Sequence, residues 1–248
     1  MISSLIFVLA LAGDLTITET MSTNAGGARN EVTRVTLLKD DRLRAETITP
    51  DGTRAVIYDL SSDKLILLDS KKHEATTRGL REVVATAERT IPARKVESSI
   101  TPALRHKTIF NSTCDEYAVA VTVPVTSHDG MVLHTTGTVC IRKDSPGADE
   151  YAYFARRAID QRLILSEGSD NRIIVAIDRA KTELYRRIVE IGFPYCIEVS
   201  FRFEGGGVLS TLLNSKSGGR VLRVTALSVE AIPDDQFGIP AGWRIRKK

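Results

Sequence analysis

Residues 43–68, LRAETITPDGTRAVIYDLSSDKLILL, contain several strand and turn signals in succession. Residues 43–47 alternate apolar or small with charged side chains, a period of two that is typical of a β-strand with one buried face. Asp51-Gly52 is among the strongest short hairpin signals, and the apolar strand 55–58 follows it. A serine-rich turn then leads into 65–68, a continuous apolar run that suits a central strand. This stretch therefore predicts consecutive antiparallel strands joined by tight turns.

On the amino-terminal side, the same alternation at residues 15–20 and 32–37 predicts further strands. After Arg78 the period changes to that of a helix, and apolar residues recur three and four apart. The sequence predicts helices near 78–91, 146–165 and 171–191. Strands resume over 107–141 and 195–230, and this second region includes 208–213 as a strand.

These elements predict an α+β fold. Because no linker-like stretch and no internal repeat separates them, we expect one domain over residues 13–248. Helices inserted between runs of antiparallel strands cover one face of a sheet, and a large sheet curls because its strands twist. We therefore expect a single large curved antiparallel sheet, a half-open barrel, with about three helices on its concave face. An apolar cleft between sheet and helices would follow.

Residues 1–12 are predicted to be a signal peptide, because an apolar run of signal length ends in Ala10-Leu11-Ala12. No Lys or Arg precedes the run, so a buried first strand or a misplaced start is the alternative. The residues after the expected cleavage point are Gly13-Asp14 rather than the Cys of a bacterial lipoprotein. We expect an exported protein, periplasmic or extracellular, that is soluble, and no later segment is long and apolar enough to be transmembrane.

Composition argues against several function classes. The formal net charge of +3 comes from 34 basic and 31 acidic residues spread along the chain, which does not indicate a nucleic-acid partner. No nucleophile elbow, phosphate loop or dinucleotide fingerprint is present, so we expect no cofactor and no enzymatic activity. The histidines, which show no metal-ligand spacing, are His73, His106, His128 and His134. A hydrolase with an unrecognised site is the minor alternative, and it would need a histidine paired with a carboxylate in a pocket.

The three cysteines allow one disulfide and one free thiol. The meander places Cys140 and Cys196 side by side on neighbouring strands, which makes this pair the candidate disulfide. With a two-residue turn at His128-Asp129, Cys114 would be about three residues out of register with Cys140. That offset is roughly 10 Å, too far to bridge. The alternative is three buried free thiols.

Several short segments and the tail resemble the LolA-like superfamily of exported bacterial lipid and lipoprotein carriers, and more closely an uncharacterised family of secreted proteins within it. The segments that carry the resemblance are Leu38-Lys39-Asp40-Asp41-Arg42-Leu43-Arg44, Cys114-Asp115-Glu116-Tyr117, Asp144-Ser145-Pro146-Gly147, Gly192-Phe193-Pro194 and Pro233-Asp234-Asp235-Gln236-Phe237-Gly238-Ile239-Pro240-Ala241-Gly242-Trp243. The resemblance implies a half-open β-barrel capped by helices that holds acyl chains or other apolar ligands. It assigns no ligand residue individually, because such carriers use a diffuse apolar lining.

The resulting hypothesis is an exported non-enzymatic carrier or sensor that binds an apolar small molecule, a lipid, an acyl chain or a lipoprotein moiety between sheet and helices. The side chains expected to line that space lie on the helix faces: Leu80, Val83, Val84, Ile174, Ile177, Leu184 and Ile188. For any one of them, the alternative is an ordinary core position. The alternative function is a structural or interaction domain that binds an envelope protein and has no ligand cavity.

Overall fold

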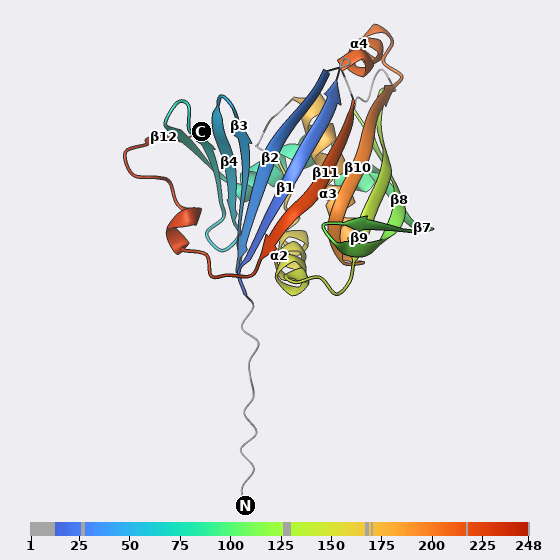
Figure 1. The fold of residues 1–248 in the computed structure, drawn as a ribbon. Coiled ribbons are helices and arrows are strands. Elements are labelled where there is room, and N and C mark those ends of the chain that lie inside the picture. Colours follow the sequence, from blue (N-terminus) through green and yellow to red (C-terminus); the bar gives the residue numbers. More distant parts are fainter. Residues whose placement is uncertain are drawn as a thin grey trace, which may run out of the picture.

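The computed structural model describes residues 13–25, 28–125, 130–166, 169, 171–216 and 218–247. The expected signal peptide at residues 1–12 lies outside these ranges. Within them the chain forms one twelve-stranded open sheet with helices packed against it, which confirms the predicted α+β fold class (Figure 1). The strands are β1 (Leu15–Ala25), β2 (Ala28–Lys39), β3 (Arg42–Thr49), β4 (Gly52–Asp59), β5 (Lys64–Asp69), β6 (Glu74–Gly79), β7 (Glu97–Ile109), β8 (Ser112–Pro124), β9 (Val132–Arg142), β10 (Phe193–Glu204), β11 (Gly219–Ser228) and β12 (Arg244–Lys247).

The strand order explains how one sheet spans the chain. It runs β12-β6-β5-β4-β3-β2-β1-β11-β10-β9-β8-β7, so two meanders, β1–β6 and β7–β11, meet where β11 pairs with β1 (Figure 1). The neighbouring pairs are antiparallel except for β12, which lies parallel to β6. β11, the last strand of the second meander, thus pairs with β1, the first strand of the chain, and makes the sheet continuous.

Helices occupy the three regions in which they were expected: α1 (Leu80–Thr90), α2 (Ala148–Asp160) and α3 (Arg172–Val189). The side chain of Asn171 caps α3 by accepting hydrogen bonds from the backbone N–H groups of Ile173 and Ile174. Gly147 precedes α2 in the left-handed region at φ 74°. A Cβ atom there would lie 2.3 Å from a methyl carbon of Leu15, so this tight approach also requires glycine.

The prediction of a strand at residues 208–213 is wrong, because this segment belongs to helix α4 (Val208–Lys216), which stands at one end of the sheet (Figure 1). All three residues of 205–207 are glycines with positive φ, which turn the chain out of the path of β10. The side chain of Asn214 then donates to the carbonyl of Phe203 and accepts from its N–H, each at 2.7 Å. The side-chain amide of Asn214 thus makes the two hydrogen bonds that a neighbouring strand would otherwise make with the backbone of Phe203.

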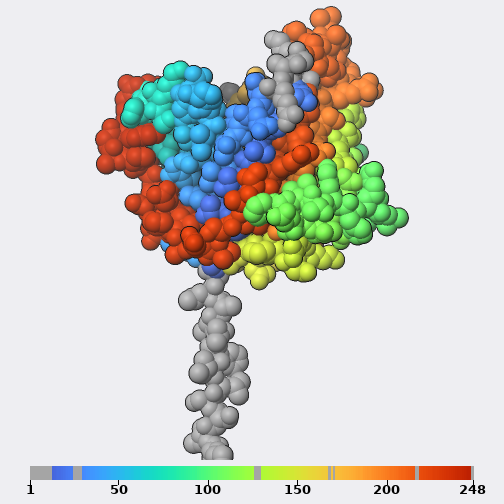
Figure 2. Space-filling view, in the orientation of Figure 1, coloured from blue at the N-terminus to red at the C-terminus, as the bar shows by residue number. Residues whose placement is uncertain are grey.

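The C-terminal tail covers the face of β3–β6 that is opposite the helices. Lys39 donates to the carbonyl oxygen of Ile232, and Arg42 contacts the carboxylate of Asp234 at 2.7 Å and stacks over the ring of Phe237. The red tail wraps this edge of the molecule in Figure 2. The tail thereby closes an apolar cluster on this face of the sheet, whose buried members are Ala55, Ile57, Ile66, Leu68, Ala75, Ile232 and Phe237.

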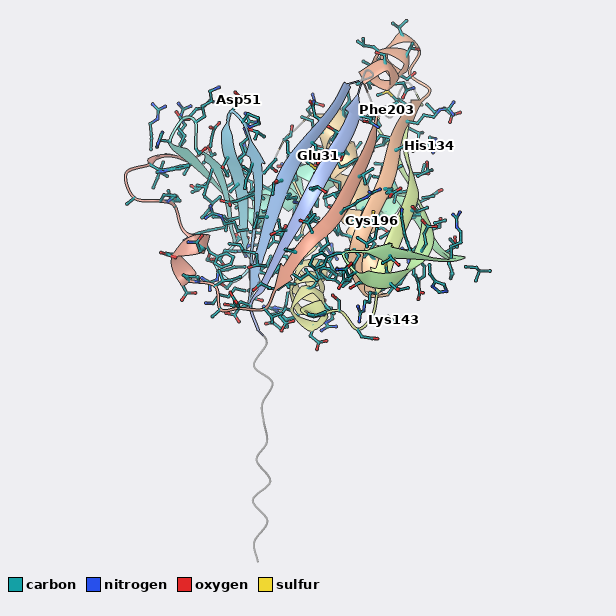
Figure 3. All side chains as sticks on the ribbon, viewed as in Figure 1. Glu31, Asp51, His134, Lys143, Cys196 and Phe203 are labelled. Carbon is teal, nitrogen blue, oxygen red and sulfur yellow. A yellow bond between two sulfur atoms is a disulfide. The ribbon has the colours of Figure 1, made fainter. Side chains whose placement is uncertain are left out.

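The cysteine pairing predicted from the sequence is wrong. Cys114 is bonded to Cys140 with their Cα atoms 5.5 Å apart, and Cys196, labelled on β10 in Figure 3, is a buried free thiol. Cys196 does pair with Cys140 in the ladder as expected, but its thiol donates to Glu198 instead, at 3.4 Å. The error lies in the β8–β9 register. Glu116 is opposite Cys140, so Cys114 is offset by two residues rather than three and shares the face of its partner.

Candidate functional site

A cleft of about 1930 Å³ opens between the strands β1–β6 on one side and the helices α2 and α3 on the other. It arises because α3 packs against β7–β10 and α2 against β2 and β10. The helices are therefore fixed mainly to the second half of the sheet. The first half curves past them and leaves the space between.

The strand register arranges the sheet wall of the cleft in rows that run across the strands. The deepest row is apolar: Leu38, Leu43 and Tyr58 line the cleft, and the row continues outside the lining into Leu15 and Leu65. The middle row is apolar or small and consists of Ile17, Thr36, Ala45, Val56, Leu67 and Thr76. The third row is mostly charged and consists of Glu19, Arg34, Thr47, Arg54, Asp69 and Glu74.

Accessibility changes from row to row. In the deepest row Leu15, Leu38, Tyr58 and Leu65 are all buried, whereas in the middle row only the members on β1 and β2 are. In the charged row Arg54 is exposed and the other members are half-buried. The floor of the cleft, at the deepest row, is thus closed and apolar. Its mouth, at the charged row, is open to solvent. Such a gradient suits a ligand with an apolar and a polar end.

The helical wall combines aromatic, small and polar side chains. From α2 come Tyr151, Phe154 and Ala155, and from α3 come Asp178 and Tyr185. The apolar stripe of α3 is buried against β7–β10, and Tyr185 packs against the edge of that cluster while it also lines the cleft. The same helix therefore contributes side chains to the core and to the cleft.

The structure places only one of the seven predicted lining residues in the cleft wall. That residue is Ile174, which is 44 % exposed. Of the others, Leu80, Val83, Leu184 and Ile188 are fully buried core residues, and Ile177 and Val84 are half-buried outside the lining. The physical reason is that an amphipathic helix has one apolar stripe, and here the core takes it.

Sequence reasoning missed the sheet wall and the charged residues of the cleft. The alternation at residues 43–47 puts Leu43, Ala45 and Thr47 on one face, and this was the available signal. It could not identify what lies opposite that face, since α2 and α3 are more than 80 residues distant along the chain.

A half-buried charged group, formed by Glu19 and Arg34, lies where the middle and charged rows meet the helices. Glu19 and Arg34 are directly opposite in the ladder, with Nε and Oε2 3.9 Å apart. Burial raises the pKa of Glu19, against the opposing effect of Arg34. Burial also raises the pKa values of the Tyr151 and Tyr185 hydroxyls, so both stay protonated and can donate hydrogen bonds. The group can therefore offer several donors to a ligand.

Arg220 on β11 adds a second cation to this wall of the cleft. Its Nε is buried and has no hydrogen-bond partner among the residues that the structure describes. Burial lowers its pKa, and the nearby Arg34 acts in the same direction. A guanidinium in this position is incompletely compensated by the protein itself.

The histidines of the described part of the chain do not line the cleft. No group of three or more His, Cys, Asp or Glu residues in that part could hold a metal ion, and His128 lies outside the described residues. His106 and Asp115 are 2.8 Å apart, but both side chains are largely exposed and neither lines the cleft. In the same described ranges, no helix combines the length and apolarity needed to cross a bilayer.

No protein-family model matches this sequence, and no curated protein matches it either. The structure is similar to that of an uncharacterized conserved protein from Thermus thermophilus, with 8% identity and a TM-score of 0.43 over 96% of this chain and 92% of that chain. It is also similar to a LolA superfamily protein from Nitrosomonas europaea, with 10% identity and a TM-score of 0.33 over 92% of this chain and 90% of that one. A LolA superfamily protein, the kind of protein that the sequence segments resemble, is thus among the structures to which this chain is similar.

Proposed function

We propose that this protein is an exported, non-enzymatic carrier or sensor that binds the apolar part of a lipid, an acyl chain or a lipoprotein in the cleft between β1–β6 and the helices α2 and α3. The observation that carries the proposal is the cleft itself, whose volume of about 1930 Å³ exceeds the roughly 300–1,000 Å³ of common small-molecule sites. Its apolar middle row gives a surface that water solvates poorly, and an acyl chain would cover it.

Two further observations support the proposal. The Cys114–Cys140 disulfide is typical of an oxidising compartment such as the periplasm, which agrees with export. The size of the cleft argues against the alternative of an interaction domain that has no ligand cavity.

The test is occupancy of the cleft. Protein isolated from the periplasm without detergent should carry lipid that native mass spectrometry detects. The delipidated protein should then bind N-phenyl-1-naphthylamine, a neutral apolar probe whose fluorescence rises in a dry site.

A matched pair of variants on β3 locates the probe. Ala45 lies in the middle row, and Ala45→Trp would fill the cleft with an indole ring. Ile48 is exposed on the other face of the same strand, so Ile48→Trp adds the same ring outside the cleft. We expect Ala45→Trp to abolish probe binding and Ile48→Trp to preserve it, with both variants folded. Equal binding by the two variants would refute the cleft as the site.

A further inference from the structure

We infer that the ligand is amphipathic and carries an anionic head group, a carboxylate or a phosphate, which Arg34 and Arg220 bind while its apolar part lies along the middle row. This inference rests on the proposed function and specifies the ligand of the same cleft.

The first argument is the balance of charge around the site. The charged side chains that act on Arg34 and Arg220 are Glu19 on β1 and Asp178 on α3, and Asp178 already contacts Lys181 at 3.1 Å. Two arginines and one lysine therefore face two carboxylates. The excess is one positive charge in a partly desolvated space, where an anion from outside would be bound more strongly than in water.

The second argument is that the cations have free capacity. Arg34 has one ion pair, with Glu19, and the 3.9 Å separation of the two atoms is longer than a hydrogen bond. Arg220 makes no ion pair with any described residue, and its buried Nε has no partner among them. A planar guanidinium binds carboxylate or phosphate oxygens through paired N–H groups. The hydroxyl of Tyr185, which interacts with both arginines, adds a neutral donor.

The third argument is the position of this group relative to the apolar rows. Arg34 and Thr36 are two residues apart on β2 and both point into the cleft, so the charged row lies roughly 6.8 Å from the middle row. A head group at Arg34 therefore leaves the chain of the ligand directed along Thr36 and Leu38 toward the closed floor. A neutral oil would leave the remaining hydrogen-bonding capacity of Arg34 and Arg220 unused.

Competition among matched ligands tests the inference. Dodecanoate, dodecyl phosphate and dodecanol share one alkyl chain and differ in the head group, and each would be titrated against bound N-phenyl-1-naphthylamine. We expect at least one of the anionic ligands to compete about tenfold or more better than dodecanol, the size of one charge-assisted hydrogen bond. Which of the two anions is preferred distinguishes a carboxylate from a phosphate head group.

Variants of β11 connect the preference to one side chain. Arg220→Met and Arg220→Gln remove a cation that has no ion-pair partner among the described residues, so both should fold, and both should lose the preference while still binding the probe. Arg223→Met is the control, because it removes the same charge from an exposed position on the opposite face of the strand. It should keep the preference.

The outcomes separate the two proposals. Equal competition by all three ligands, with the probe still bound, would overturn the anionic head group and leave the carrier function standing. Absence of probe binding would overturn the carrier function. Adding sodium phosphate to the competition assay, with sodium chloride at equal ionic strength as the control, tests whether the site binds a free anion. If it removes the preference at concentrations similar to those of dodecyl phosphate, the site binds a small anion and the amphipathic ligand is refuted.

Discussion

Two isoleucines on α3 allow the division between core and cleft to be measured. Ile188 is 0 % exposed and belongs to the cluster packed between α3 and β7–β10, whereas Ile174 is 44 % exposed and lines the cleft. We expect Ile188→Ala to reduce stability strongly and to leave ligand affinity unchanged. Ile174→Ala should have a small effect on stability and should weaken binding of an apolar ligand.

The expected magnitudes follow from burial. Each substitution removes three carbons, which corresponds to about 2.4 kcal/mol for a fully buried side chain. At Ile188 an unfilled cavity adds to this loss, so the free energy of unfolding should fall by about 2.4–5 kcal/mol. At Ile174 a little over half of the residue is covered, and the space left by the substitution opens into the cleft. The loss there should be about 1.3 kcal/mol.

The two variants can be compared directly, because both replace isoleucine by alanine and both lie on α3. Urea unfolding with a common m-value gives the two free energies, and titration with N-phenyl-1-naphthylamine gives the two affinities. Equal losses of stability at the two positions would refute the assignment of Ile188 to the core and of Ile174 to the cleft. So would weaker probe binding in the Ile188 variant than in the Ile174 variant.

Three other predictions concern the second half of the sheet. Cys114→Ser should lower the free energy of unfolding by about 3.5 kcal/mol in urea, because the bridge closes a loop of 26 residues, and a loss under ~1 kcal/mol would contradict this. Burial and the neighbouring Glu198 carboxylate raise the pKa of Cys196 to about 11. The rate of its alkylation by iodoacetamide should therefore still rise about tenfold per pH unit above pH 9. A plateau of the rate above pH 9 would show a thiol with an ordinary pKa. Gly137→Ala should cost about 3 kcal/mol or more in thermal unfolding, since its Cβ would lie 1.9 Å from the carbonyl oxygen of Glu198. Gly219→Ala, whose nearest neighbour is 3.6 Å away, is the control that should change little.

The sequence predicted the strand meander and the three long helices because their signals are local. Alternation at residues 43–47 and the Asp51-Gly52 turn depend on neighbours in the chain, as does the helical spacing that follows Arg78. The wrong prediction of a strand at residues 208–213 arose because the deciding contacts there are not local. That apolar run is compatible with either structure, and the side-chain bonds from Asn214 to Phe203 belong to the folded molecule.

Local patterns in the sequence were therefore enough to predict the α+β class, the antiparallel meander and an amphipathic helix with a single apolar stripe. The surface that this stripe covers, the strand register that joins Cys114 to Cys140, and the cations that face the cleft became known from the folded chain. They depend on contacts between residues that are distant in sequence. A change of one residue in register reverses the face of a side chain while leaving the local pattern the same.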